Sequence, residues 1–344
     1  MPEYHYSALQ TYATCPRQAY YRYRKRIQPA QTPLALIMGI DIHEVIAEMF
    51  RNPHDDDNKA RVDAKIAEIQ SHYPDSDEIM KVGWTEYTRA ELREMLEVTL
   101  ERFYETRRKQ ILDNYDVIDV EKDFQFEHNG DIYGGTIDLV IRRKMDGKLC
   151  LLDWKSISKQ IQEGYLELNT QKYMYAVACS VLYGEYPSTF YVGGVLKRKI
   201  RYPTVLKNGT ISCSDSTLKD CTYDSFMSVI RSNELSEEPY AEILAKLKEK
   251  DSYDIVNLFP LEHLDLTEKM IINGWDRIVQ LKRLWQFSVE SDAWPKCDGM
   301  SCSMCKNTYQ KLCVAEEMGA DIEEVLLDDY VVRAPNDRAE AWDL

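Results

Sequence analysis

The sequence lacks the run of roughly 20 apolar residues that a membrane-spanning helix requires, so we expect no membrane partner. It also lacks low-complexity tracts and internal repeats, and its 44% hydrophobic content argues against a disordered chain. The first six residues are polar and aromatic, without the apolar stretch of a secretory signal. We therefore expect a globular, cytoplasmic protein.

Basic residues are outnumbered by acidic ones. The 43 Lys and Arg residues against 58 Asp and Glu residues give a net charge of −15. This balance argues against a protein that coats nucleic acid non-specifically, because phosphate binding needs clustered cations. A groove can still be basic locally, and basic clusters stand at residues 17–26, 142–144 and 197–201.

Hydrophobic periodicity divides the 344 residues into four regions. Residues 1–115 are expected to be helical, residues 116–200 to form the sheet, residues 201–318 to be helical with a cysteine group at the end, and residues 319–344 to be a peripheral acidic tail. In the first region, Ser7 is a candidate cap for a short helix that Pro16 interrupts. Further helices are predicted at 41–51 and, in segments, at 59–115.

The second region has the character of a sheet. Strands are predicted at 117–127, 131–143, 149–154 and 189–196, with a helix at 167–182 before the last strand. This β-β-β-α-β order predicts an α/β fold with a mixed central sheet flanked by helices. Later helices are predicted at 223–231, 241–250 and 264–287.

An acidic–lysine group stands on two of these strands. Asp138 lies within one strand and Asp153 at the end of the next, and a hairpin places neighbouring strands about 5 Å apart. Two carboxylates held this way suit Mg²⁺ or Mn²⁺, and the Trp154 carbonyl offers another ligand. Lys155 alternates with Asp153 and so shares its face of the strand, where its ammonium can orient water or stabilise charge on a phosphate.

Each of these residues also has a plain structural alternative. Asp-x-Lys is common at strand ends, where both charges are simply solvated. Gln171 and Tyr175 share one helix face and can hydrogen-bond a nucleic acid backbone, or can be a surface glutamine above a core tyrosine. His43 can complete a metal shell or be structural.

Five of the nine cysteines fall near the two ends of the chain. Cys15 is near the start, and Cys302, Cys305 and Cys313 lie within twelve residues near the end, with Cys297 just before them. Four thiolates suit zinc or a [4Fe–4S] cluster, and local spacing does not separate these. The stretch 20–26 is aromatic and basic, which is typical of single-strand binders and equally of a packed helix with a solvated basic face.

As an ordered set, these pieces resemble the RecB-like branch of the PD-(D/E)XK nuclease superfamily, which includes iron–sulfur nucleases of CRISPR adaptation and AddB-type recombination nucleases. The matching segments are SALQTYATCPRQAYYRY, GIDIHEVI, GGTIDLV, LLDWKS, QKYMY and the terminal cysteines, which together span residues 7 to 313.

The resemblance implies a restriction-endonuclease-like fold in a prokaryotic or phage protein. It implies metal ligation by His43, Asp138 and Asp153, catalysis by Lys155, and support from Gln171 and Tyr175. Glu121 matches an additional acidic position of some relatives. Asp153 stands where glutamate is commoner, and its shorter side chain changes the spacing of the metal ligands.

The split cysteine arrangement resembles that of the iron–sulfur nucleases, which implies a [4Fe–4S] cluster held by Cys15, Cys302, Cys305 and Cys313. The seven residues before Cys313 exceed the usual gap, and Cys297 is the alternative ligand. Zinc remains the alternative cofactor.

The expected activity is Mg²⁺- or Mn²⁺-dependent exonucleolytic hydrolysis of single-stranded DNA or DNA ends, in recombination, repair, phage replication or CRISPR adaptation. Expected partners are DNA and a protein of recombination or CRISPR adaptation, and a homo-oligomer is compatible with the resemblance. The alternatives are a catalytically silent binding module that retains the nuclease fold and a zinc-stabilised adaptor.

Overall fold

A six-stranded mixed sheet forms the centre of the protein. The structure, a computed structural model, describes residues 3–30, 33–73, 79–82, 85–162, 164–197, 201–218, 221–297, 302, 308–320, 325 and 329–333. The sheet has the strand order β1-β6-β7-β8-β9, and β5 pairs with the other edge of β6. Its strands are β1 (Glu3–His5), β5 (Tyr115–His128), β6 (Asp131–Arg143), β7 (Leu149–Ile157), β8 (Thr189–Leu196) and β9 (Leu261–Asp265).

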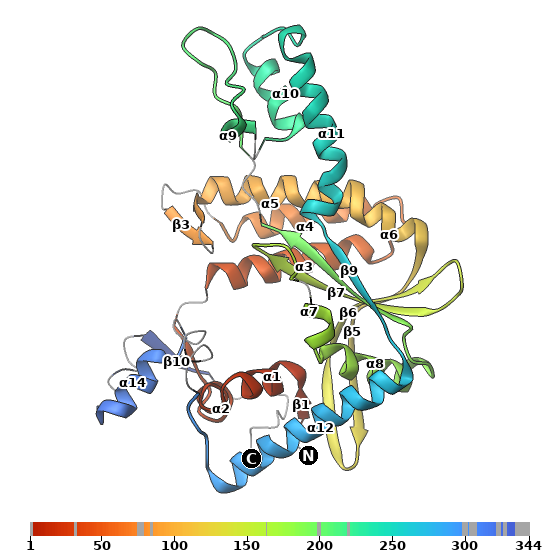
Figure 1. Ribbon diagram of the computed structural model, residues 1–344, viewed down its shortest axis with the longest axis vertical. Coiled ribbons are helices and arrows are strands. Elements are labelled where there is room, and N and C mark those ends of the chain that lie inside the picture. Colours follow the sequence, from red (N-terminus) through yellow and green to blue (C-terminus); the bar gives the residue numbers. More distant parts are fainter. Residues whose placement is uncertain are drawn as a thin grey trace.

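Helices cover both faces of this sheet (Figure 1). On one side, α3 (Leu34–Phe50), α4 (Asn58–Gln70) and α5 (Arg89–Phe103) share a core with β6, β7 and β8. On the other side, α1 (Tyr6–Thr14), α8 (Gln171–Tyr183) and α12 (Glu268–Ser291) share a second core with the same strands. The prediction of a mixed sheet flanked by helices is confirmed, and the fold is restriction-endonuclease-like.

The alternation along β7 decides where its polar residues lie. Leu149 and Leu151 belong to the core beneath α8 and α12, whereas Leu152 and Trp154 belong to the core beneath α3 and α5. Successive side chains of a strand point to opposite faces. Asp153 and Lys155 therefore follow Leu149 and Leu151, towards α8.

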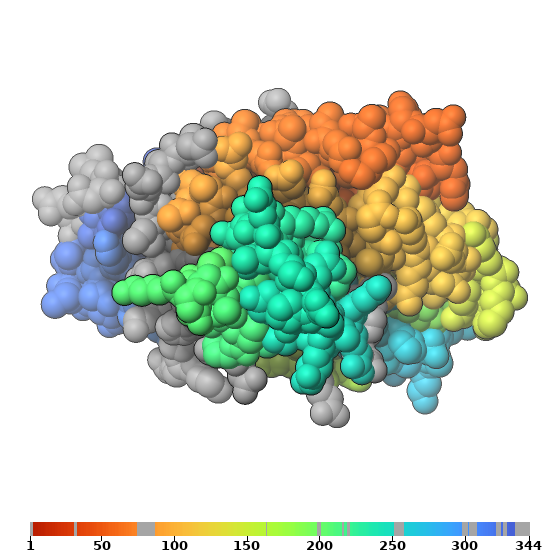
Figure 2. Space-filling view, turned by 90° about the horizontal axis from the view of Figure 1, so that it is seen from above, coloured from red at the N-terminus to blue at the C-terminus, as the bar shows by residue number. Residues whose placement is uncertain are grey.

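An insertion of mostly helical structure follows β8. It contains α9 (Asp215–Leu218), α10 (Tyr223–Ser232), η3 (Glu238–Tyr240) and α11 (Ala241–Leu258), with a small apolar core of its own that includes Phe226. Figure 2 shows it standing in front of the helices α4 and α5 when the molecule is seen from above.

The remaining elements are short. They are α2 (Pro16–Ala19), the π-helices η1 (Tyr20–Arg24) and η2 (Tyr104–Arg108), α6 (Lys109–Asn114), α7 (Tyr165–Leu168), α14 (Gln310–Met318), β2 (Ile27–Pro29), β3 (Ile79–Val82), β4 (Thr85–Thr88) and β10 (Tyr330–Val332). The described helices include none that is both long and apolar enough to cross a membrane.

Several boundaries differ from the predictions. The first helix begins at Tyr6, with His5 rather than Ser7 at the N-cap. The helix expected at 264–287 is preceded by β9, which contains Leu264. Part of the acidic tail is not peripheral, because β10 pairs with β2 and the buried Tyr330 stacks on Tyr309.

Candidate functional site

The site begins where two strands of the sheet separate. β6 pairs with β7 through Leu139–Leu152 to Arg142–Leu149 and with β1 through residues 132–134. β7 continues beyond Leu152 alongside β8 instead. Asp138 and Asp153 are the next residues in the β6–β7 register, so both predicted carboxylates lie at the point of separation.

Asp138 links this point to α3. Its Oδ2 accepts a hydrogen bond of 2.7 Å from the Trp154 backbone N–H and lies 3.5 Å from Nδ1 of His43. Burial raises the pKa of the Asp138 carboxyl, and Lys155 and the Trp154 N–H oppose this shift. Burial and the nearby Lys155 lower the pKa of His43. Asp153 and a hydrogen bond with the Trp154 backbone raise it, but the net effect is a lowered pKa. Near neutral pH His43 is therefore the uncharged imidazole that metal binding requires.

Glu121 completes this group from the neighbouring strand. It lies between the register pairs Val120–Leu139 and Lys122–Ile137, which places it opposite Asp138. One ligand atom each from His43, Glu121 and Asp138 lies within 4.8 Å of the others. Burial and the Asp138 carboxylate raise the pKa of Glu121 to about 7. Among the described residues, this is the only group of three or more metal-ligating side chains that meets this distance.

The backbone at Glu121 is itself unusual. Its φ of +48° lies in the left-handed region, which costs a non-glycine residue about 1 kcal/mol or more and is concentrated at functional sites. A register shift between Val117 and Asp119 interrupts the ladder just before it. From Asp119 to His128 the β5–β6 pairing keeps one register, which the tight turn at Asn129–Gly130 sets, so this turn is the sequence signal that places Glu121 opposite Asp138.

Asp153 and Lys155 form an ion pair beside this group. The Lys155 Nζ lies 2.7 Å from Oδ2 of Asp153, whose side chain is almost fully buried. Burial raises the pKa of Asp153 to about 6, although Lys155 lowers it. Burial lowers the pKa of Lys155, but the carboxylates of Asp153 and Asp138 raise it, and the net effect is a raised pKa. Lys155 is therefore charged at neutral pH.

Trp154 contributes through its backbone and anchors the strand through its side chain. The buried indole stacks on Phe50 at 6.2 Å and meets Phe103 edge-on at 5.0 Å. It lies against Gly193, its register partner on β8, where an added Cβ would come within 2.1 Å of the ring. A glycine is required there, and this packing fixes the strand between Asp153 and Lys155.

The helix α8 brings Gln171 and Tyr175 to the same side of the sheet. The Gln171 Nε2 donates to the Tyr175 hydroxyl at 2.6 Å, as expected for two residues on one helix face. Tyr175 is buried and meets Phe124 edge-on. Burial and the carboxylates of Asp153 and Asp138 raise its pKa well above the usual value. The phenol therefore stays protonated.

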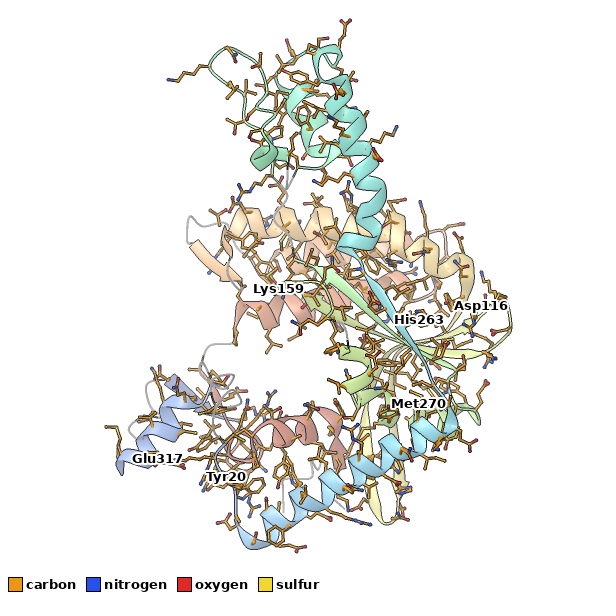
Figure 3. All side chains as sticks on the ribbon, in the orientation of Figure 1. Tyr20, Asp116, Lys159, His263, Met270 and Glu317 are labelled. Atoms are coloured by element: carbon orange, nitrogen blue, oxygen red, sulfur yellow. The ribbon has the colours of Figure 1, made fainter. Side chains whose placement is uncertain are left out.

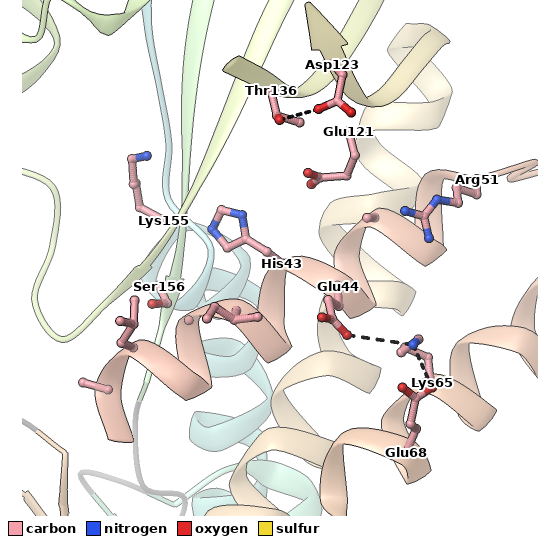
Figure 4. Close-up of a pocket in the computed structure, with 15 residues that line it drawn as sticks. His43, Glu44, Arg51, Lys65, Glu68, Glu121, Asp123, Thr136, Lys155 and Ser156 are labelled. Atoms are coloured by element: carbon pink, nitrogen blue, oxygen red, sulfur yellow. Dashed lines mark hydrogen bonds and ion pairs between the residues drawn. The ribbon is translucent and has the colours of Figure 1, made fainter. Parts of the chain in front are cut away.

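A cavity of about 940 Å³ opens onto His43, Glu121 and Lys155 of this site. Figure 4 shows His43 between Lys155 and Glu121 in this cavity, with Arg51 and Lys65 further along α3 and α4. Its lining residues are Ala35, Leu36, Gly39, Ile40, His43, Glu44, Ala47, Arg51, Lys65, Glu68, Glu121, Asp123, Thr136, Lys155 and Ser156.

Three of the four predicted cluster ligands, Cys15, Cys302 and Cys313, lie among the described residues. Cys15 is buried between α1 and α2, and Cys305 lies outside the described residues. The Cys297 Sγ lies 3.2 Å from the Thr14 carbonyl oxygen, and the Arg17 N–H donates to the Pro295 carbonyl at 3.1 Å. Residues 14–17 and 295–297 therefore meet beside Cys15, and Cys297 takes part in this contact.

The aromatic and basic stretch at 20–26 is packed into the protein. Tyr21 and Tyr23 are buried, Tyr21 stacks on Tyr309, and Tyr20 lies 5.7 Å from Trp294 between ring centroids. Figure 3 places Tyr20 among the side chains of the lower helices. The packed-helix alternative therefore describes these tyrosines.

Comparison with known proteins agrees with this architecture. The model of the PD-(D/E)XK nuclease superfamily matches residues 5–306, and the chain belongs to that superfamily. A crystal structure from Eubacterium rectale, named “Putative exonuclease”, is similar at a TM-score of 0.35 and 11% identity, over 67% of this chain and 79% of that one. Comparison with curated proteins gives no match.

Proposed function

We propose that the protein is a divalent-metal-dependent deoxyribonuclease that removes nucleotides from single-stranded DNA or from DNA ends. The observation that carries the proposal is the convergence of His43, Glu121 and Asp138 next to the Asp153–Lys155 ion pair. These side chains come from one helix and three strands of the sheet. Membership of a nuclease superfamily supports the same reaction.

The donor set fits Mg²⁺ or Mn²⁺. It offers carboxylate oxygens and one uncharged imidazole, and hard divalent cations prefer oxygen ligands. Burial raises the pKa of both Glu121 and Asp138, and this supports the proposal because a bound cation would offset the cost of ionising them. Asp153 and the Trp154 carbonyl are the further ligands that we propose. When bound, the ion would lower the pKa of a water and polarise the phosphate.

The surrounding side chains then have distinct roles. The charged Lys155 ammonium can orient the attacking water and stabilise negative charge on the phosphate. Its ion pair with Asp153 fixes its position. Tyr175, protonated and positioned by Gln171, can donate a hydrogen bond to the nucleic acid backbone. We propose that a strand terminus enters the cavity along α3.

Digestion of end-labelled DNA tests this function. We expect the purified protein to release short labelled products from single-stranded DNA with Mn²⁺ and none with a chelator. Lys155→Ala should lower the rate about 100-fold, the usual effect of losing one charge-stabilising donor. Lys148→Ala, at an exposed lysine beside the β6–β7 turn, is the matched control. An RNA strand of the same sequence measures the preference for DNA.

Two outcomes would contradict the proposal. One is a wild-type protein that binds the labelled strand with Mn²⁺ but leaves it intact, which is the behaviour of the catalytically silent module. The other is a Lys155→Ala variant that cleaves at the wild-type rate.

We also propose that Cys15, Cys302, Cys305 and Cys313 hold a [4Fe–4S] cluster, with Cys297 as the alternative ligand. The contact between residues 14–17 and 295–297 beside Cys15 supports this assignment. Ligation of distant segments couples binding of the group to folding. We expect iron and visible absorbance in the wild type, and loss of both, together with solubility, in Cys15→Ala. A soluble, brown Cys15→Ala protein with full iron content would contradict it, and bound zinc without iron would favour the alternative cofactor.

A further inference from the structure

One face of α3 lines the cavity for four turns and changes character at His43. On the C-terminal side of His43 stand the charged residues Glu44 and Arg51, with Ala47 between them. On the N-terminal side stand only Ala35, Leu36, Gly39 and Ile40, which we call the aliphatic shelf. Figure 4 shows this part of α3 running below Ser156 and His43. An uncharged surface therefore adjoins the proposed metal site.

The two large side chains of the aliphatic shelf are held out of the core. Leu36 is 53% exposed and Ile40 is 50% exposed, one helical turn apart. The opposite face of α3 already buries Met38, Ile42 and Val45. Exposed apolar surface within a polar rim is typical of a ligand-binding groove.

The cations of the cavity are already paired with carboxylates. Lys65 lies 2.7 Å from Glu68, and Lys155 lies 2.7 Å from Asp153. Arg51 lies 3.1 Å from Glu48. The lining contains four acidic residues, Glu44, Glu68, Glu121 and Asp123, against the three basic residues Arg51, Lys65 and Lys155. Such a lining does not attract a row of phosphates.

A ligand that fits both the proposed metal site and the aliphatic shelf carries one phosphate beside an apolar, planar group. An unpaired nucleotide meets this description, because its base has an open face. In a duplex the base faces are covered by stacking and pairing. We propose that the aliphatic shelf holds the base next to the scissile phosphate, so that the enzyme selects an unpaired strand. This inference rests on the proposed nuclease function.

The gap between α3 and β7 limits where the base can lie. A Cβ added at Gly39 would come within 3.1 Å of the Ser156 Oγ. The helix therefore approaches the strand closely at this point. The base is then confined to the side of α3 that carries Leu36 and Ile40, which makes these two side chains its contacts.

Steady-state cleavage of a single-stranded oligonucleotide, intact or with one abasic residue beside the scissile bond, tests the contact. We expect Ile40→Ser to raise KM for the intact strand about tenfold with kcat within about twofold, in the range of base contacts in single-strand binders. The abasic residue should raise the wild-type KM similarly. Combining variant and abasic strand should add little, because both remove the same contact.

The control is Ile272→Ser, at an isoleucine of α12 that is 48% exposed and does not line the cavity. Circular dichroism verifies folding of both variants. An unchanged KM in Ile40→Ser overturns the inference. So does an increase in KM that is equal for intact and abasic strands, which would assign the aliphatic shelf to another occupant, such as a protein segment. A wild type that cleaves neither strand overturns the proposed function itself.

Discussion

Replacing Glu121 by glutamine should stabilise the folded protein without metal and reduce the stability that it gains from metal. The pKa of Glu121 is raised from 4.5 to about 7 by burial and by Asp138. At 1.36 kcal/mol per unit, ionised Glu121 costs the metal-free fold up to about 3 kcal/mol. Because the folded pKa is raised, this cost is absent below pH 4.5, grows as the pH rises to about 7, and is complete above it.

Metal binding should favour the stability of the wild type over that of Glu121→Gln. A ligand present at 100 times its Kd stabilises the folded state by about 2.7 kcal/mol. Glutamine keeps the size of the side chain and the positive φ of the backbone, so the substitution isolates the charge. We expect Glu121→Gln to be more stable than wild type at pH 8 with a chelator, and to gain much less stability from Mn²⁺.

Urea unfolding at pH 8, with chelator and with a Mn²⁺ series, measures both effects. Glu127→Gln, at an exposed position of the same strand, is the control. If Glu121→Gln in chelator is less stable than wild type, the reasoning that burial and Asp138 make ionised Glu121 costly is refuted. An equal gain from Mn²⁺ in both proteins would refute the assignment of Glu121 as a ligand.

Three further predictions concern packing, pH and salt. Gly193→Ala should lower the free energy of unfolding, measured in urea, by about 2 kcal/mol, because its Cβ meets the Trp154 ring. In a Trp154→Phe background the same substitution should cost less. If the effects of the two substitutions simply add in the double variant, the explanation is wrong. Burial and Arg277 lower the pKa of Lys172 from 10.5 to about 8. The stability of the wild type should therefore rise, relative to that of Lys172→Met, by up to about 3 kcal/mol between pH 8 and 10.5. A stability difference that does not change with pH contradicts this. Because the cations of the cavity are paired with carboxylates, few of them should neutralise phosphates. The logarithm of the affinity for single-stranded DNA should therefore fall with the logarithm of the salt concentration at a slope near −1, and a slope steeper than about −3 would contradict this.

The local sequence predicts the middle of the sheet well. The strands at 131–143 and 189–196 have the predicted bounds, because runs of apolar and β-branched residues between turn signals identify buried strands. The strand from Leu149 extends to Ile157 because β8 pairs with it beyond Trp154. By contrast, β1 has only three residues, and its place beside β6 depends on a partner about 130 residues away.

Helix boundaries show where apolar spacing alone misleads. Leu264 continues the apolar pattern of the following helix, although it belongs to β9. The helix begins after Thr267, whose side chain accepts a hydrogen bond from the Met270 N–H. This N-cap signal was present in the sequence and marks the start better than the periodicity does.

The candidate site divides in the same way. The proximity of Asp138 and Asp153 follows from a hairpin with a short turn, and the Asp153–Lys155 pair follows from alternation. The position of Glu121 opposite Asp138 follows from the register that the Asn129–Gly130 turn sets between β5 and β6, whereas the left-handed backbone at Glu121 has no sequence signal. The aliphatic shelf could not be predicted either, because exposure of Leu36 and Ile40 depends on how α3 lies against β7.

The most direct test of the account is diffraction from a crystal grown with Mn²⁺, recorded at the manganese absorption edge. We expect one anomalous peak within coordination distance of His43, Glu121 and Asp138, roughly 2 Å from each ligand atom. The same crystal form of an Asp138→Asn variant should lack the peak. A wild-type crystal with no peak among these three residues at saturating Mn²⁺ would contradict the proposed metal centre.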